Sequence, residues 1–503
     1  MFRRFRTDYR GNVAIVFALT LLPILAAVGC AVDYSLASRM KSKLQVAADA
    51  ASVAAISKNS AGYKAAISMT QNGPVPAGVT DANAVFNGSA ATFSGYNNLT
   101  VSSTVTKTGA TLSSSVQFSA SIPTVFLGIL GYSSLTLAGT STSSAGLPLY
   151  LDFYLVIDVS GSMGLPSTTS EAQRLQAVTP DNFVDYPYGC AFACHFSAQW
   201  SCWNFGYPTN GYCMSYAISR VSQSGYKALL STNNSNPMDV QLPNSMVSGL
   251  PDSLYNVLTP VANCPSFGTD SCIQLRIDAV SASVNQLLGA ANNLEVIANQ
   301  YRVGLYPFIQ NLYAYFPLTS SINGSSSNSS TINYAAANLP SLLDTNGNAN
   351  LGSGGTHIDT ALSSINSLIT SVGSGSASND TLPYVFLITD GAQDNQTKGV
   401  PNGSWSGSNH ATVIDPNSSC SPLKSRGIIV SVLYIPYLPI SPVNSSFAGN
   451  EDDAANNNIP NIPGSLKGCA SSGYFYTANT PADITSALNA MLNHAIAGAH
   501  ITN

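Results

Sequence analysis

The stretch "FYLVIDVSGSM", residues 153–163, indicates the fold of the larger part of this chain. Its first five residues are apolar or aromatic, which is typical of a strand that is buried on both faces. Three oxygen-bearing side chains follow at alternate positions, namely Asp158, Ser160 and Ser162. An acid and two hydroxyls directly after a buried strand predict a polar site at the end of that strand.

Strand and helix patterns alternate after this stretch. The alternation predicts an α/β domain over residues 148–503, with a doubly wound, mostly parallel sheet and a long Cys-rich insertion at about 164–274. The expected elements are a helix at 276–294, strands at 301–308 and 312–319, a helix starting near Thr356, strands at 384–391 and 427–435, and a last helix after Thr480, with a Ser/Asn-rich loop at 320–350.

Two more polar positions are expected at the same edge of the sheet. Asp390 ends the strand "YVFLITDG", and Thr356 begins a helix in "GGTHIDTAL". Ligands of such sheets bind outside the carboxyl ends of the strands, so we expect both residues to lie near Asp158, Ser160 and Ser162. Two carboxylates and three hydroxyls suit Mg²⁺, with Mn²⁺ or Ca²⁺ as alternatives. So few carboxylates would leave the metal electrophilic, and an acidic group from a partner would complete its coordination.

Each of these positions also has a purely structural interpretation. Ser160 and Ser162 can belong to a polar turn, Thr356 can cap a helix, and Asp390 can lie in an ordinary turn. Their joint occurrence at predicted strand ends and a helix start favours the metal site.

An uncharged apolar segment, residues 12–32, precedes all of this. At about 1.5 Å per residue it just spans a hydrocarbon core of roughly 30 Å. Arginines are concentrated in residues 1–11, so the positive-inside rule places that segment in the cytoplasm and the bulk of the chain outside. The alternatives are a cleaved signal peptide and a lipid-modified Cys30 in "AVGC".

Two segments connect the apolar segment to the α/β domain. Residues 33–56 carry small apolar residues at helical spacing, so the helix is expected to continue outside the membrane. Residues 57–147 are rich in Ser and Thr and contain short β-favouring runs at 99–122 and 134–146, which predict a small β-containing domain.

The composition is typical of a secreted or cell-envelope protein. Only 9% of the 503 residues are charged, against about 25% in typical soluble domains. The net charge of −5 gives no indication of nucleic-acid binding. The length favours two or more domains.

The cysteines predict disulfides outside the cytoplasm. Of the nine, Cys30 lies in the apolar segment, and the other eight form an even set whose pairing the sequence does not determine. Zinc at Cys190, Cys194 and His195 is an alternative. The eight are Cys190, Cys194, Cys202, Cys213, Cys264, Cys272, Cys420 and Cys469.

No motif points to an enzyme. The stretch "SGSMG" lacks the first glycine of a nucleophile elbow, and the five histidines show no H-E-x-x-H spacing. The segment 344–355 is similar to a calcium loop, but Ala349 replaces the required glycine and Gly355 the final glutamate. We therefore expect a binding or structural protein.

The polar positions Asp158-x-Ser160-x-Ser162, Thr356 and Asp390 resemble the metal-ion-dependent adhesion site of the von Willebrand factor A (VWA) domain. The resemblance implies that Ser160, Ser162 and Thr356 bind the metal directly, and that Asp158 and Asp390 act largely through water. It also implies metal-dependent protein–protein binding.

The amino terminus resembles TadG-like proteins of the Tad (tight adherence, Flp pilus) machinery. The resemblance lies in "RGNVAIVFALTLLPILAAVGCAVDYS" (10–35), "LQVAADAASVAA" (44–55) and the order anchor, small domain, VWA domain. It implies a single-pass protein of the bacterial inner membrane, periplasmic or surface-exposed, that acts in pilus assembly or adhesion. Expected partners are other pilus components or a surface ligand. It also implies a Cys420–Cys469 disulfide, which leaves the other six cysteines to the insertion.

A second function stays open. The chain can be a structural envelope protein whose metal site only stabilises the fold.

Overall fold

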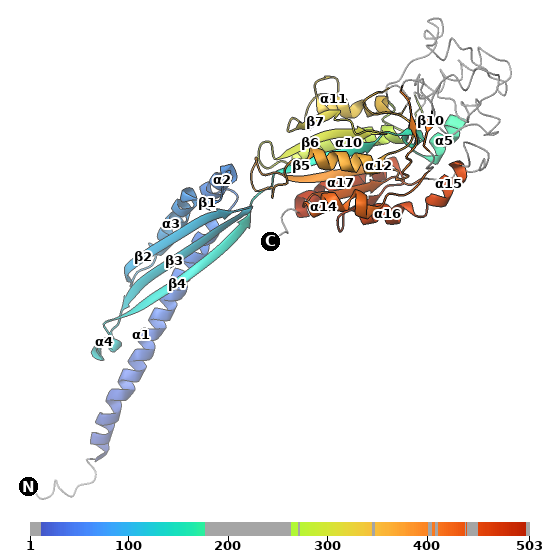
Figure 1. Ribbon diagram of the computed structural model, residues 1–503. Helices are drawn as coiled ribbons and strands as arrows, with labels where there is room; N and C mark the ends of the chain where they lie inside the picture. The colour runs from blue at the N-terminus through green and yellow to red at the C-terminus, as the bar shows by residue number, and fades with distance from the viewer. Residues whose placement is uncertain are drawn as a thin grey trace, which may run out of the picture. The chain divides into compact units, whose positions relative to one another are not determined.

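The computed structural model describes residues 12–176, 263–269, 272–344, 348–400, 405–407, 411–437, 439 and 451–498. The chain divides into two compact units, residues 1–148 and 149–503. The first unit combines a long helix with an antiparallel sheet, and the second is a sheet with helices on both faces (Figure 1). The helix and the small β-containing segment, which the sequence analysis treated separately, pack into one unit.

Helix α1 (Asn12–Ala54) forms both the anchor segment and part of a core. Its amino-terminal half is long and apolar enough to cross a membrane, and large side chains along it, such as Phe17, Leu25 and Val28, are exposed. Its carboxyl-terminal half buries Leu44, Ala48 and Ala51 against the sheet. These small side chains let the helix approach the strands closely.

The sheet of the first unit has the order β1-β2-β3-β4 and is antiparallel throughout. Alternate residues of β3 are buried, because one face of the sheet packs against helices. Val105 of β2 contacts Gly78 of α3, where a Cβ would lie 2.7 Å from the valine side chain. The elements are α2 (Ala61–Ser68), β1 (Gly73–Pro74), α3 (Pro76–Ala90), β2 (Asn97–Thr108), β3 (Thr111–Pro123), α4 (Phe126–Ile129) and β4 (Ser134–Gly146).

The sheet of the second unit has the order β12-β11-β8-β5-β6-β7. All neighbouring pairs are parallel except β6 and β7. The chain starts at β5 in the middle, runs outward through β6 and β7, and returns to the other side of β5 at β8. The carboxyl ends of β5 and β8 therefore flank the topological switch point, where sheets of this kind bind ligands. The strands are β5 (Leu151–Asp158), β6 (Tyr301–Phe308), β7 (Phe316–Thr319), β8 (Leu382–Thr389), β11 (Ile429–Tyr434) and β12 (Phe475–Thr477).

Helices cover both faces of this sheet, which explains why every residue of β5 is buried. Tyr154 and Val156 share a core with helices α12 (Ile358–Leu368), α14 (Ser421–Ser425) and α16 (Ile462–Cys469). On β8, the Tyr384 hydroxyl donates to the Ala495 carbonyl of α17 (Pro481–Gly498), 3.2 Å away, and α17 contacts α10 (Arg276–Leu294).

The remaining elements are short. They are the 3-10 helices η2 (Gly161–Gly164) and η4 (Leu339–Leu342), the helices α5 (Thr169–Gln176), α11 (Ile332–Ala337), α13 (Pro416–Ser419) and α15 (Glu451–Asn458), and the two-residue strands β9 (Thr397–Lys398) and β10 (Trp405–Ser406).

The predicted fold class is confirmed, with local corrections. The segment 320–350 was expected to be a loop, but Thr331 caps α11 by accepting a hydrogen bond from the Tyr334 amide. Helices α2 and α3 were not expected at all within the β-containing segment. The strand expected at 312–319 is shorter and begins at Phe316.

Two disulfides lie among the described residues of the second unit. Cys420 and Cys469, the pair that the resemblance implies, are joined within the core between β11 and its covering helices. Cys264 pairs with Cys272 just before α10. Cys30 is free. The other expected disulfide residues, Cys190, Cys194, Cys202 and Cys213, lie outside the described residues, as does the possible zinc ligand His195.

Candidate functional site

Asp158 is the last residue of β5 and is fully buried. Its Oδ1 accepts hydrogen bonds from the Ser160 amide (2.9 Å) and the Ser160 hydroxyl (2.6 Å). Its Oδ2 accepts from the Thr389 hydroxyl, 2.7 Å away at the end of β8. The carboxylate thus fixes the turn after β5 and ties together the two strands at the switch point.

The two serines continue this arrangement. Ser160 precedes η2 and Ser162 lies within it, and both side chains are buried. Their hydroxyl oxygens are 3.2 Å apart. Neighbouring oxygens of an octahedral magnesium ion are about 3.0 Å apart, since its bonds are about 2.1 Å long. The spacing therefore fits two adjacent positions on one ion.

Asp390 follows β8 and is also fully buried. Its Oδ2 accepts from Arg276 Nη1 at 3.3 Å, whereas its Oδ1 has no hydrogen-bond partner in the part of the chain that the structure describes. The next residue, Gly391, has a φ of 85°, and a Cβ there would lie 2.4 Å from Ile462. The glycine lets the chain turn away after Asp390, so the carboxylate stays at the strand end.

Thr356 lies at the start of α12, in a loop bridged to the segment after β8. Its amide donates to the Asp394 carbonyl (2.8 Å), and the Asp394 amide donates back to the Thr356 carbonyl (3.0 Å). Asp394 comes four residues after Asp390 in the sequence. This pairing therefore holds the backbone of Thr356 against the segment that follows Asp390. Within the described residues, hydrogen bonds join Asp158, Ser160 and Ser162 to one another, whereas none joins Thr356 or Asp390 to the other predicted ligands.

Among the described residues, Arg276 is a charged partner of Asp390 that the sequence did not predict. It begins α10, is almost fully buried, and donates to the Pro436 carbonyl at 2.9 Å as well as to Asp390. Its guanidinium lies over the Tyr437 ring, 5.2 Å from the centroid. No motif marks this arginine, because it comes after the long insertion.

The ends of the insertion meet beside the site. Pro166 and Leu275 form an isolated antiparallel bridge, and the Arg276 amide donates to the Leu165 carbonyl at 2.8 Å. The insertion therefore leaves η2 and returns to α10 at the same place, and this return positions Arg276 against Asp390.

Burial dominates the electrostatics of the two carboxyl groups. It raises the pKa of Asp158, although hydrogen bonds from Ser160 and Thr389 oppose the rise. Burial and then the nearby Asp158 charge raise the pKa of Asp390 to about 7, and the guanidinium of Arg276 and the nearby hydroxyls of Ser162 and Tyr437 oppose this. Two carboxylates that share a buried site with one guanidinium favour the uptake of a further positive charge.

The donor set fits a small divalent cation. Carboxylate and hydroxyl oxygens are hard ligands, and Asp390 Oδ1 is a buried acceptor that a cation would satisfy. Residues 12–176, 263–269, 272–344, 348–400 and 411–498, as far as they are described, hold no cluster of three or more His, Cys, Asp or Glu side chains that could bind a metal. Asp344 of the calcium-like loop instead accepts from the Ser353 hydroxyl (2.8 Å) and the Gly354 amide (2.9 Å).

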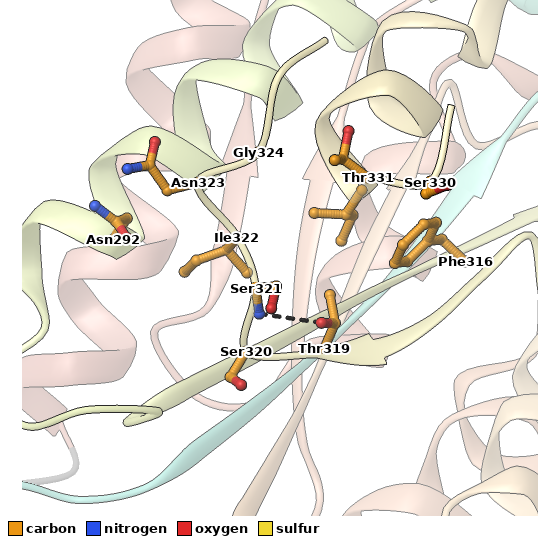
Figure 2. Close-up of a pocket in the computed structure, with 11 residues that line it drawn as sticks. Asn292, Phe316, Thr319, Ser320, Ser321, Ile322, Asn323, Gly324, Ser330 and Thr331 are labelled. Atoms are coloured by element: carbon orange, nitrogen blue, oxygen red, sulfur yellow. Dashed lines mark hydrogen bonds between the residues drawn. The ribbon is translucent and has the colours of Figure 1, made fainter. Parts of the chain in front are cut away.

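A separate concave site lies between β7, α10 and the start of α11 (Figure 2). Its volume is about 440 Å³, and it is lined by uncharged residues such as Asn292, Phe316 and Thr331. The Thr319 hydroxyl accepts from the Ser321 amide at 3.0 Å. Its polar lining consists of hydroxyl and amide side chains.

The amino-terminal segment of the chain matches a known protein family. The family described as Flp pilus-assembly TadE/G-like matches residues 11–66. The chain begins with a TadE/G-like segment. This segment comprises α1, the turn that follows it and most of α2. No curated protein matches the chain.

Solved structures resemble the chain only distantly. The pilus adhesin SpaC from Lactobacillus rhamnosus GG has 12% identity and a TM-score of 0.32, with 80% of this chain and 34% of that chain covered. The PilB minor pilin from Streptococcus sanguinis has 10% identity and a TM-score of 0.31, covering 79% and 78%. The von Willebrand factor domain of the type V pili tip protein Mfa5 from Porphyromonas gingivalis has 10% identity and a TM-score of 0.31, with 71% of this chain and 99% of that chain covered. This chain thus spans about a third of the SpaC adhesin.

The VWA-type fold predicted for the carboxyl-terminal unit is confirmed by its sheet, with β5 and β8 at the switch point and one antiparallel edge strand. The metal assignment stays a prediction.

The raised pKa of Asp390 predicts a pH dependence of stability in the metal-free protein. The folded pKa of about 7 lies above the unfolded value of about 3.9, so the folded state keeps a proton that the unfolded state has lost. The free energy of unfolding in EDTA should therefore fall as the pH rises from about 4 to about 7, by at most about 1.4 kcal/mol per pH unit.

Asp390→Asn should flatten this slope, because the amide does not ionise. The measurement is denaturant unfolding of both proteins at several pH values in EDTA. Asp453→Asn on α15 is the matched control and should keep the wild-type slope. An equal slope in wild type and Asp390→Asn would show that Asp390 does not carry the buried charge.

Proposed function

We propose that the VWA-type unit binds a protein partner through a divalent cation, most simply Mg²⁺, held by Asp158, Ser160, Ser162, Thr356 and Asp390. The observation that carries this proposal is the buried, hydrogen-bonded set of oxygens at the switch point, with Asp390 Oδ1 left unsatisfied. Such a site binds and presents a cation, and in it the Ser160 hydroxyl that donates to Asp158 at 2.6 Å is a metal ligand.

The same proposal places this binding in a Tad pilus system. The TadE/G-like match and the apolar half of α1 support a protein anchored in the inner membrane, with its amino terminus in the cytoplasm. The two disulfides support an oxidising compartment for the second unit. The partner is another pilus component or a surface ligand that offers a carboxylate to the metal.

Arg276 orients one of the two carboxylates of the site. It pairs with Asp390 Oδ2 and leaves Oδ1 free, so the guanidinium orients the carboxylate without filling the cation position. It also supplies one positive charge to a site that holds two carboxyl groups. A divalent cation then leaves one net positive charge at the site, and a partner carboxylate would balance it.

Burial of the ligands also favours the second candidate function, a metal that only stabilises the fold. Asp158, Ser160 and Asp390 are each at most 1% exposed. A metal at this depth reaches a partner only if the partner's acid enters past Ser162 and Thr356, which are slightly more exposed. Two experiments separate metal binding from partner binding.

Thermal unfolding of the full-length protein in detergent tests metal binding. Mg²⁺ at 100 times its dissociation constant should stabilise the folded state by about 2.7 kcal/mol. Ser160→Ala combined with Ser162→Ala should abolish the shift, because two direct ligands are lost. Ser325→Ala with Ser327→Ala, an exposed pair with the same spacing, is the matched control and should keep the shift. A Mg²⁺ shift that survives in the Ser160/Ser162 variant would contradict the site.

Pilus assembly and surface attachment of cells that produce the full-length protein test partner binding. Loss of a metal-bridged carboxylate should weaken binding at least about tenfold, so the Ser160/Ser162 variant should reduce both readouts while the Ser325/Ser327 variant does not. Normal assembly and attachment with a folded, metal-free Ser160/Ser162 variant would leave the cation a stabilising role only.

A further inference from the structure

The connection between β3 and β4 ends in an exposed apolar tip, Val125–Tyr132. The sequence of this tip is "VFLGILGY", and its short helix α4 buries none of its residues. Ile129 is 81% exposed and Val125 is 70% exposed. The other large exposed side chains are Phe126, Leu130 and Tyr132. An exposed apolar cluster of this kind usually marks a contact surface.

Helix α1 holds the tip in place through one carboxylate. Asp33 Oδ2 accepts from the Leu127 amide (2.7 Å) and the Phe126 amide (2.9 Å), and its Oδ1 accepts from the Val125 amide (3.2 Å). These amides form the amino-terminal turn of α4, where backbone donors are otherwise unsatisfied. The carboxylate is buried by this contact, so its charge is balanced by three donors.

A glycine one turn earlier on α1 lets the tip lie against the helix. A Cβ at Gly29 would lie 2.3 Å from Cγ of Phe126. Gly29 and Asp33 are four residues apart and therefore lie on the same helical face. Together they fix the tip at the level of residues 29–33, and Figure 1 shows α4 beside α1.

That level is the outer end of the anchor segment 12–32. At about 1.5 Å per residue, Gly29 lies about 4–5 Å inside this end. The apolar side chains of the tip are thus at the depth of the boundary between lipid headgroups and acyl chains, beside a helix whose own apolar side chains are exposed.

The chemistry of the tip suits lipid better than a second protein. Residues 108–151 contain no Asp, Glu, Lys, Arg or His, so the tip adds no charge of its own to the one on Asp33. Tyr132 and Tyr34 are both exposed near this level, and tyrosine is enriched at membrane interfaces because its ring is apolar and its hydroxyl polar. Protein interfaces more often surround an apolar centre with a polar rim.

We propose that the tip Val125–Tyr132 inserts into the outer lipid interface beside the anchor helix, as a second membrane contact of the first unit. This inference rests on the membrane anchoring in the proposed function. The occupant is the bilayer, and the contact fixes the height of the antiparallel sheet above the membrane.

Tryptophan scanning of the full-length protein in phosphatidylcholine vesicles tests the inference. Ile129→Trp reports on the tip, Leu21→Trp on the anchor segment, and Val53→Trp, an exposed position on the distal half of α1, is the matched control. The three native tryptophans give a background that the wild-type protein measures. Quenching by lipids brominated at shallow or deep acyl positions reports the depth of each indole.

We expect Ile129→Trp to show blue-shifted emission and stronger quenching by shallow than by deep bromines. Leu21→Trp should be quenched more by deep bromines, and Val53→Trp by neither. If Leu21→Trp is quenched and Ile129→Trp is not, the tip does not contact lipid, and a blue shift without quenching would place the indole against protein, in the same chain or a second copy. If Leu21→Trp is not quenched, the anchoring itself fails and the inference falls with it.

Discussion

The burial of two carboxyl groups at adjacent strand ends is the constraint on which the second unit depends. Asp158 and Asp390 follow β5 and β8, which neighbour each other in the sheet, and neither side chain reaches solvent. Buried carboxylates are tolerated only when they are hydrogen-bonded, paired or bound to a metal. Asp158 is fully hydrogen-bonded, whereas Asp390 has one oxygen paired with Arg276 and one unsatisfied. Asp390 Oδ1 is therefore a buried acceptor at the switch point without a hydrogen-bond partner among the described residues.

The turn after β5 contacts Asp158, and the start of α10 contacts Asp390. Ser160 and Ser162 hold Asp158 and place two hydroxyls beside it, and the return of the insertion brings Arg276 to Asp390. One guanidinium does not balance two carboxylates, so the metal-free site must hold a proton or remain strained by repulsion. A divalent cation relieves this repulsion, which makes cation binding the simplest explanation for keeping two acids buried at this edge.

Much of the fold and of the candidate site was predictable from the sequence, and the exceptions have physical reasons. Uninterrupted apolar runs marked β5 and β8, so Asp158 and Asp390 could be placed at one edge. Helices α2 and α3 were missed because Gly and Ala dominate their buried faces, which gives little hydrophobic periodicity. Arg276 was missed because its position depends on where the insertion returns. The tip at 125–132 is a visible apolar run, but only the hydrogen bonds of Asp33 place it beside the anchor.

The central claim is that the oxygens of Asp158, Ser160, Ser162 and Asp390 surround one cation. Anomalous X-ray scattering from crystals of the full-length protein grown with Mn²⁺ tests this most directly, because Mn²⁺ takes the same oxygen ligands as Mg²⁺ and scatters anomalously. We predict one peak bonded to the hydroxyls of Ser160 and Ser162 and facing Oδ1 of Asp390, with Arg276 still on Oδ2. No peak at this position, with the Arg276–Asp390 pair intact and Oδ1 covered by a protein donor, would contradict the claim.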